Sequence, residues 1–430
     1  MFFEREKGGE RAVTVNVTGF SQLETPDYDE FLLLVHAAGV EGAASFECNR
    51  KYPSPAYFIG SGKLDELKKV VKENDVDVVL FNHALSPGQE RNIERVLGCR
   101  VVDRTGVILD IFAQRARTYE GKLQVELAQL SHLSTRLIRG WTHLERQKGG
   151  IGLRGPGETQ LESDRRMVRD RITMLKSRLK KVSSQRDQSR QPRMKQDKPI
   201  VSLVGYTNAG KSSLFNCVTE SDVMVQDMLF ATLDPTYREW MIPELGPTML
   251  VDTVGFIRHL PHDLVEAFNS TLEESVYANL LLHVVDVSHE DHVSMIEAVE
   301  GVLEEIGADH IPCLQVYNKI DVLDVPETID RDESGKPVRV WISVHQKRGL
   351  ALLQQAILEC LGHDQLRGCL TLPYHLGGLR STLYEIEAVV SESISDLGEY
   401  ELTISVPKAR LMSLFSQHKV DVTRCWVVEQ

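Results

Sequence analysis

The stretch that decides the fold is Gly205-Tyr206-Thr207-Asn208-Ala209-Gly210-Lys211-Ser212, which fits the pattern G-x-x-x-x-G-K-[ST]. An apolar run at 199–204 predicts a buried strand before it, and residues 212–217 predict the start of a helix after it. A strand, a glycine-rich loop and a helix in this order form a phosphate-binding loop, because backbone N–H groups and the helix N-terminus attract anions. We expect Lys211 to neutralise the β- and γ-phosphates of a nucleotide and Ser212 to ligate Mg²⁺ through its hydroxyl group.

A second motif, Asp252-Thr253-Val254-Gly255, fits D-x-x-G and follows a short apolar run. At the end of a buried strand, Asp252 would lie near Mg²⁺, with a water molecule between them. The backbone N–H of Gly255 would sense the γ-phosphate.

Between these two motifs lies Phe230-Ala231-Thr232-Leu233-Asp234-Pro235. We interpret it as a switch loop whose Thr232 closes on Mg²⁺ only when the γ-phosphate is present. The sequence therefore predicts catalytic roles for Lys211, Thr232 and Gly255, and metal ligation by Ser212 and Thr232.

A third motif, Asn318-Lys319-Ile320-Asp321, fits N-K-x-D and follows the apolar run 313–317. The Asp321 carboxylate can accept two hydrogen bonds from guanine, whereas adenine would leave it unpaired at a high cost. Ser343-Val344-His345 is a weaker candidate for a last base-contacting loop. The predicted GTP/GDP contacts are residues 205–212, 230–234, 252–255, 318–321 and 343–345.

Two residues refine the expected mechanism. Phe256 stands where Ras-like enzymes carry a glutamine that orients the attacking water, and phenylalanine can neither donate nor accept. Unaided hydrolysis should therefore be slow, with a partner or another residue such as His259 positioning the water; alternatively, slow binding and release is itself the function. Asn208 matches the asparagine of potassium-stimulated GTPases and could help to bind K⁺, although asparagine also suits a tight turn.

The composition limits the class of protein. A length of 430 residues predicts about three domains, and no apolar run is long enough to span a membrane. The N-terminus lacks the form of a signal peptide, and seven scattered cysteines without C-x-x-C spacing argue for a reducing compartment and against a zinc site. We expect a cytoplasmic protein, with peripheral contact to a membrane left open.

The charge is unevenly distributed. Residues 115–198 carry 21 Lys and Arg against 9 Asp and Glu, a local net charge of +12 in a chain whose net charge is −13. An acidic protein with one concentrated basic segment is expected to use that segment to meet a polyanion.

The first 110 residues alternate between strand and helix patterns. Strands are expected at 13–17, 43–47, 76–81 and 100–102, with helices at 27–38, 63–74 and 87–97, which predicts a small α/β domain with a parallel sheet. Gly60-Ser61-Gly62-Lys63 could bind a phosphate, but a glycine turn before a helix is the favoured interpretation.

Two helical stretches follow, at 105–138 and 159–188, each with apolar residues at heptad-like spacing. We expect an antiparallel helical hairpin. The break between them is rich in glycine and carries Trp141 and the basic residues Arg139, Arg146, Lys148 and Arg154. It is either a solvated loop or a probe that inserts into folded RNA, with arginines on phosphates and Trp141 stacked on a base.

The expected organisation is therefore an α/β protein of four parts: an N-terminal α/β domain (1–110), a basic helical hairpin with a linker (111–198), a P-loop GTPase domain (199–362) with a mostly parallel sheet flanked by helices, and a small α+β domain (363–430). In the last part, strands are expected at 370–372 and 400–406 and helices at 379–390 and 409–417. The basic run 183–198 looks like a linker.

The chain resembles the HflX family of Obg–HflX-like P-loop GTPases. The resemblance rests on GYTNAGKS (205–212), FATLDPT (230–236), DTVGFIRHLP (252–261), NKID (318–321) and, most specifically, GGIGLRGPGETQLE (149–162). It covers residues 10–365 well, and the region beyond 370 only loosely.

The resemblance implies a monomeric, Mg²⁺-dependent GTPase that binds the large ribosomal subunit, meaning 23S rRNA and ribosomal proteins. It also implies hydrolysis stimulated by ribosomes and dissociation of stalled or idle 70S ribosomes under stress, with the hairpin tip reaching toward the peptidyl-transferase region. Two alternatives stay open: a GTP-switched adaptor for a protein partner, and an RNA-modification GTPase that uses K⁺. Binding to a polyanion should weaken steeply with salt, and a protein interface less so.

Overall fold

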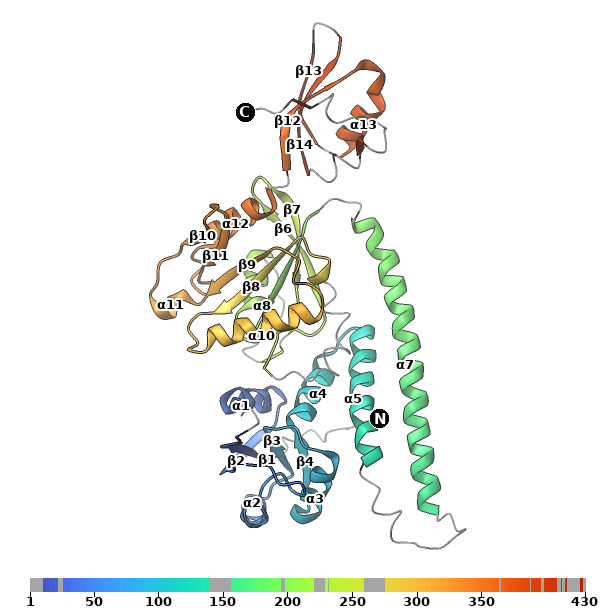
Figure 1. Cartoon of the computed structure of the whole chain (residues 1–430), viewed down its shortest axis with the longest axis vertical. Coiled ribbons are helices and arrows are strands. Elements are labelled where there is room, and N and C mark those ends of the chain that lie inside the picture. The colour runs from blue at the N-terminus through green and yellow to red at the C-terminus, as the bar shows by residue number, and fades with distance from the viewer. Residues whose placement is uncertain are drawn as a thin grey trace.

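The structure is a computed structural model of the whole chain, and it describes residues 11–21, 26–139, 156–194, 198–219, 229–230, 232–258, 275–362, 365–386, 388–395, 398–407, 411, 414–415 and 426–427. Three bodies, each with its own sheet, are stacked along the long axis, and two antiparallel helices run beside the lower two (Figure 1). The fold is the α/β class expected from the sequence.

The N-terminal domain is a four-stranded parallel sheet in the order β2-β1-β3-β4. Local signals define its elements; for example, Ser86 and Gln89 form a capping box at the start of a helix that ends at Gly98, whose φ is +78°. The predicted parallel sheet is confirmed, with shifts of a few residues at the ends of the elements. They are β1 (Arg11–Thr18), α1 (Tyr28–Ala37), β2 (Glu41–Asn49), α2 (Ser61–Glu73), β3 (Val78–Phe81), α3 (Pro87–Leu97), β4 (Arg100–Asp103) and α4 (Arg104–Arg115).

The glycine-rich start of α2 has an ordinary environment. Gly60 is the N-cap of this helix, and the Lys63 ammonium group lies 2.5 Å from the Glu66 carboxylate. A lysine paired with a carboxylate of its own helix favours the glycine-turn interpretation of this segment over a phosphate site.

The helical hairpin is confirmed, with three corrections. The single helix expected at 105–138 is two helices, α4 and α5 (Tyr119–Arg139), because Ala116 adopts an extended conformation with ψ 111°. The second helix, α7 (Pro156–Met194), begins three residues before the expected start at residue 159. It also extends through most of the segment expected to be a linker, where Arg and Gln residues are good helix formers.

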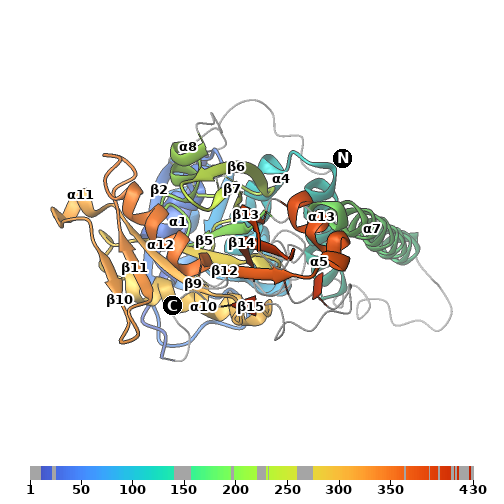
Figure 2. The same ribbon diagram turned by 90° about the horizontal axis from the view of Figure 1, so that it is seen from above.

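An apolar seam joins α5 to α7. Leu123, Leu130 and Leu175 are buried in it, with Leu127, Leu133, Val168, Ile172 and Leu179 packed around them. The Arg171 guanidinium bridges to Glu126 across the seam at 2.6 Å. Seen from above, the two helices lie on one flank of the molecule, opposite the sheet edge that holds β10 (Ile329–Arg331) and β11 (Pro337–Trp341) (Figure 2).

The nucleotide-binding sheet has seven strands in the order β10-β11-β9-β8-β5-β7-β6, and the pairs among β11, β9, β8, β5 and β7 are parallel. The carboxyl ends of parallel strands meet at one edge, where ligands bind in open α/β sheets. This edge carries all the predicted nucleotide motifs. The remaining elements are β5 (Ile200–Gly205), α8 (Lys211–Thr219), β6 (Thr236–Ile242), β7 (Gly246–Asp252), β8 (Leu280–Asp286), α10 (His292–Glu305), β9 (Cys313–Asn318), α11 (Ile320–Leu323) and α12 (Leu350–Gly362).

The C-terminal body is an antiparallel sheet in the order β13-β14-β12-β15. The helix expected at 379–390 ends earlier, because Val389 begins a strand that pairs with Tyr400–Pro407. Most of the helix expected at 409–417 lies outside the described residues. The elements are β12 (Gln365–Leu372), η1 (Tyr374–Leu376), α13 (Gly377–Glu385), β13 (Val389–Ile394), β14 (Tyr400–Pro407) and β15 (Trp426–Val427).

The N-terminal domain and the nucleotide-binding sheet share one apolar core. Helices α1 and α4 lie between the two sheets (Figure 1). Phe31 and Phe112 from these helices belong to the same buried cluster as Phe230, Phe256 and Ile257. The phosphate-binding side of the GTPase fold is thus packed directly against the N-terminal domain. No helix in the described part of the chain is long and apolar enough to cross a membrane.

Candidate functional site

The phosphate-binding loop has the backbone geometry that its glycines permit. Three of its residues have positive φ angles: Gly205 at +144°, Asn208 at +61° and Gly210 at +97°. A Cβ atom on Gly205 would lie 2.3 Å from the Val284 carbonyl oxygen, and one on Gly210 would lie 2.3 Å from Asn318 Nδ2. Both positions therefore require glycine for two reasons: the positive φ angle, and the short distance between the loop backbone and its neighbours.

Lys211 lies at the start of α8 and is only 6% exposed. Its Nζ donates to the carbonyl oxygens of Gly205 at 3.0 Å and Tyr206 at 2.7 Å, so the ammonium group is held across the loop. Burial lowers the pKa of Lys211 to about 8, and the nearby Asp252 carboxylate partly opposes this shift. A buried cation with a lowered pKa is suited to meet the phosphates of a nucleotide.

Three oxygen atoms from three segments converge beside the loop. The Ser212 hydroxyl lies 2.9 Å from the Thr232 hydroxyl, and each donates to Asp252 Oδ2 at 2.8 Å. Burial raises the pKa of Asp252, and its Oδ1 is buried without a hydrogen-bond partner among the described residues.

This donor set fits Mg²⁺ held jointly with a nucleotide. Mg²⁺ prefers oxygen ligands and is usually bound by one or two carboxylates together with substrate phosphates and water. The described residues contain no group of three or more His, Cys, Asp or Glu side chains that could hold a metal ion. Ser212, Thr232 and Asp252 are brought together as the sequence analysis expected.

Gly255 and Phe256 join the second motif to the phosphate-binding loop. The Phe256 N–H donates to Gly205 O at 3.1 Å, and its carbonyl oxygen accepts from Thr207 N at 2.8 Å. A Cβ atom on Gly255 would lie 2.9 Å from Lys211 Nζ, which shows how close this backbone is to the phosphate position. The Phe256 side chain is 2% exposed and packs in the core, so it faces away from any attacking water.

Asn318 links the base-reading motif to the phosphate-binding loop. Its Nδ2 donates to Ala209 O at 2.9 Å, and its Oδ1 accepts from Val344 N at 3.1 Å. The Ser343 hydroxyl donates to Asp321 Oδ1 at 2.5 Å, which orients the carboxylate expected to read guanine. Lys319 has a φ of +68° and pairs with Asp286 at 2.6 Å, whereas His345 is exposed.

In the switch loop, three predicted contact residues have side chains that pack or hydrogen-bond elsewhere in the protein. The side chains of Phe230 and Leu233 are buried in the shared core, and the Asp234 carboxylate accepts hydrogen bonds from Arg117 N and Thr118 N. These three side chains contact residues of the N-terminal half of the chain. Among the described residues of this loop, Thr232 is the one whose side chain lies in the cluster with Ser212 and Asp252.

The Tyr206 side chain also points away from the phosphate position and donates to Glu30. Of the other predicted residues, Arg139 ends α5. Ala231, His259, Trp141, Arg146, Lys148 and Arg154 lie outside the described residues.

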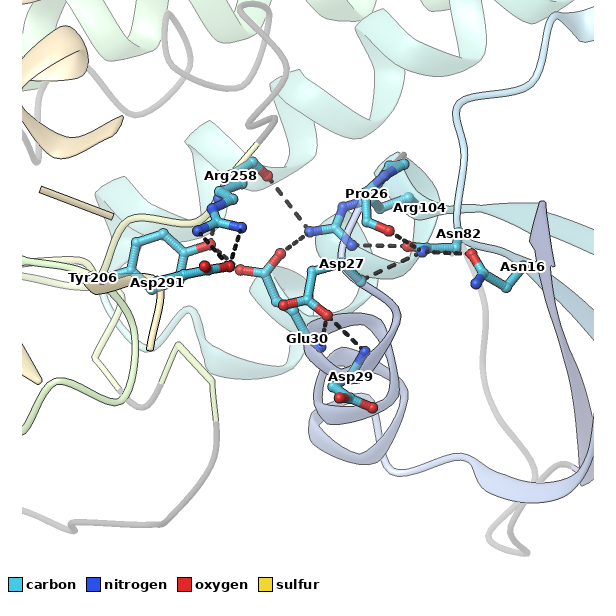
Figure 3. A network of polar contacts seen from close by, with 10 residues as sticks. All are labelled: Asn16, Pro26, Asp27, Asp29, Glu30, Asn82, Arg104, Tyr206, Arg258 and Asp291. Atoms are coloured by element: carbon cyan, nitrogen blue, oxygen red, sulfur yellow. Dashed lines mark hydrogen bonds and ion pairs between the residues drawn. The ribbon is translucent and has the colours of Figure 1, made fainter. Parts of the chain in front are cut away.

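A buried polar network next to the loop was missed by the sequence analysis (Figure 3). Glu30 on α1 pairs with Arg104 on α4 and accepts from the Tyr206 hydroxyl, which itself accepts from Arg258 N at 2.7 Å. Arg104 also donates to Asn82 Oδ1 at 2.9 Å. The available signal was a glutamate and an arginine on helix faces that are otherwise apolar, because buried charges are rarely found unless they are paired.

Comparison with known proteins identifies the family. Three family models match in succession: "GTP-binding GTPase N-terminal" at residues 26–113, "GTP-binding GTPase Middle Region" at 115–193 and "50S ribosome-binding GTPase" at 200–319. The GTPase HflX of Escherichia coli is 56% identical over 406 residues, which cover 94% of this chain and 95% of that protein. The chain belongs to the HflX family of GTPases.

A second HflX relative and one solved structure are also similar to this chain. The GTPase HflX of Magnetococcus marinus is 49% identical over 80% of each chain. Among solved structures, a GTP-binding protein from Sulfolobus solfataricus in complex with GDP aligns with a TM-score of 0.45 and 25% identity, covering 82% of this chain and 99% of that one. As an HflX-family GTPase, the chain binds GTP and GDP.

Proposed function

We propose that this GTPase binds the large ribosomal subunit in its GTP-bound state and dissociates stalled or idle 70S ribosomes, and that hydrolysis releases it. The proposal rests above all on the family model named for 50S ribosome binding, which matches residues 200–319. The relatives that match along nearly the whole chain are HflX proteins, and this supports the same conclusion.

The α5–α7 hairpin supplies a surface suited to RNA. The exposed basic side chains among the described residues of α7 include six whose charge can meet rRNA phosphates: Arg166, Arg169, Lys176, Arg178, Lys180 and Lys181. Neutralising phosphates with Lys and Arg releases counterions, so such an interface must weaken steeply as salt rises. Arg139, Arg146, Lys148 and Arg154 belong to the same proposed RNA-contacting arm.

In the proposed reaction, Lys211 neutralises the β- and γ-phosphates and the Gly255 N–H donates to the γ-phosphate. Ser212, Thr232 and Asp252 would hold Mg²⁺, which offsets negative charge on the phosphates. Asp321 reads guanine, with Ser343 fixing its orientation.

Slow unaided turnover follows from the burial of Phe256, because that side chain cannot orient a water molecule. We therefore propose that ribosomes supply or order the missing group and so stimulate hydrolysis. A role for K⁺ at Asn208 would make turnover faster in KCl than in NaCl, and Asn208→Ala would remove the difference.

The test is co-sedimentation with purified large subunits in GDP and in a non-hydrolysable GTP analogue, at two salt concentrations. We expect tight, salt-sensitive binding with the analogue and weak binding with GDP. A variant with Arg166, Arg169, Lys176 and Lys180 changed to Gln should lose most of this binding, whereas its matched control, with Lys51, Lys63, Lys69 and Lys72 changed to Gln, should keep it.

The same samples, mixed with 70S ribosomes and separated on sucrose gradients, measure dissociation directly. Binding to subunits without splitting would overturn the second half of the proposal. Absence of binding in every nucleotide state would contradict the proposal that the ribosome is the partner, and would favour a protein partner.

A further inference from the structure

The switch loop contacts both the predicted Mg²⁺ site and the start of helix α5. Thr232 contributes its hydroxyl to the cluster with Ser212 and Asp252, while Asp234, two residues later, lies at the start of helix α5. Two residues of extended chain span about 7 Å at most, so neither end of this short segment can move far without moving the other.

At the α5 end, Asp234 holds the capping residue of the helix, Thr118, which directly precedes Tyr119. Asp234 Oδ2 accepts from Arg117 N at 2.8 Å and from Thr118 N at 2.9 Å, and the Thr118 hydroxyl donates to Asp234 Oδ1. The Thr118 hydroxyl oxygen in turn accepts from Gly121 N at 2.9 Å. The Thr118 hydroxyl thus satisfies one of the first N–H groups of α5, which have no partner within the helix. The Asp234 carboxylate fixes the backbone and the hydroxyl of this capping residue.

The switch segment packs tightly against α5 through Asp234 and against α4 through Phe230. A Cβ atom on Gly121 would lie 2.3 Å from Asp234 Oδ1, so the first turn of α5 approaches the carboxylate as only glycine allows. Beside it, the rings of Phe230 and Phe112 meet edge to face with centroids 4.7 Å apart. The switch segment is thus anchored to α4 and α5 by a polar and an aromatic contact, with Thr232 between them.

We propose that Asp234 is a positioning residue of the GTPase: its contact with α5 holds Thr232 beside Ser212 and Asp252. Coupling of this kind is reciprocal. GTP binding, which fixes Thr232, strengthens the cap on α5, and a partner that orders α5 favours the GTP-bound switch without touching the nucleotide. The identification of the partner as rRNA rests on the proposed function. The coupling between Thr232 and α5 inside the chain does not depend on it.

The test compares Asp234→Ala with Asp234→Asn and Thr118→Ala. The matched control is Asp332→Ala, because Asp332 makes the same kind of contact with the backbone N–H groups of Ser334 and Lys336 in a distant turn. For each variant we would measure the affinity for fluorescent GDP and for a non-hydrolysable GTP analogue over a range of Mg²⁺ concentrations.

Asp234→Ala should weaken analogue binding about 10-fold, in line with the loss of a helix cap, and raise the Mg²⁺ concentration needed for it, while GDP affinity changes less than about twofold. Thr118→Ala should weaken analogue binding less, and Asp234→Asn should restore part of the loss. Equal weakening of GDP and analogue binding would mean that Asp234 only stabilises the fold, and would overturn the proposal.

A second measurement follows α5 itself, without ribosomes. In the wild-type protein, the backbone amides of residues 119–123 should exchange hydrogen more slowly with the analogue than with GDP, and Asp234→Ala should abolish the difference. Identical exchange in both states of the wild type would overturn the coupling. If the coupling is found but large subunits are not bound, the proposed function fails and this inference stands.

Discussion

At the scale of single residues, backbone geometry defines the nucleotide site as firmly as side-chain chemistry does. Gly205, Gly210 and Gly255 each lie where a Cβ atom would meet a neighbour at less than 3.0 Å. The neighbours are Val284 in the central strand, Asn318 of the base-reading motif, and Thr207 with Lys211. The glycines therefore connect the motifs to one another in addition to shaping the loop.

Gly210→Ala should reduce nucleotide affinity at least 10-fold. The φ of +97° is unfavourable for alanine by about 1–2 kcal/mol, and the new methyl group would displace Asn318, which also holds Val344. The control is Gly246→Ala, which has a similar φ of +84° but nothing within 4 Å of the added atom. It should lower thermal stability and leave GDP affinity unchanged; an equal loss of affinity in both variants would contradict the argument.

Lys211 makes nucleotide binding depend on pH. Its pKa is lowered to about 8 by burial, and bound phosphates would raise it, so binding at pH above about 8 must take up a proton. Through this group, affinity should fall by about twofold between pH 7 and 8, and more steeply above pH 8, by up to about tenfold per unit.

Isothermal titration between pH 7 and 8.8, in buffers of different ionisation enthalpy, measures this proton uptake. Lys211→Arg keeps its charge throughout this range, so its weaker binding should lose the pH dependence. Proton uptake that is unchanged in Lys211→Arg would assign the effect to another group.

At the scale of elements, the hairpin shows what periodicity can and cannot predict. The apolar seam of α5 and α7 was predictable, because heptad-like spacing depends only on the positions of leucine, isoleucine and valine in the sequence. The break between α4 and α5 was not, because it is stabilised by Asp234, more than a hundred residues away. The helical extension of α7 was missed because its basic composition resembles a linker.

Leu175→Ala should destabilise the hairpin by about 2–5 kcal/mol, since this side chain is fully buried between α5 and α7. Hydrogen exchange of both helices should become faster, while GDP affinity stays the same because the nucleotide site does not use this seam. Met167→Ala on the same helix is the control, because Met167 is 58% exposed. Equal effects of the two changes would mean that the seam contributes nothing to hairpin stability.

At the scale of the whole molecule, the N-terminal domain is part of the surroundings of the nucleotide site. Its contribution could not be predicted, although each nucleotide motif could. The motifs are local patterns with known chemistry, whereas Tyr206 meets Glu30 only when the nucleotide-binding sheet packs against the N-terminal domain. Sequence spacing carries no information on a contact between residues 176 positions apart.

Glu30→Ala should weaken the packing of the two domains, because it leaves Arg104 buried without its partner, a loss of about 3–5 kcal/mol. Denaturant unfolding should then separate into two transitions. Asp29→Ala, on the exposed side of the same helix, should change the midpoint by far less.

The double variant Glu30→Ala/Arg104→Leu removes both charges and should recover part of the stability lost in Glu30→Ala. If the double variant were less stable than the single one by the full cost of the second change, the pair would not be coupled.

The length of α7 has a mechanical consequence. Its 39 residues span about 58 Å, from a point beside the nucleotide-binding sheet to the far side of the N-terminal domain. A stiff rod of that length is a lever: a rotation of about 5° at its Met194 end carries its Pro156 end through about 5 Å, close to one helical pitch. The length of this helix thus sets how far a small tilt at its Met194 end would displace its Pro156 end.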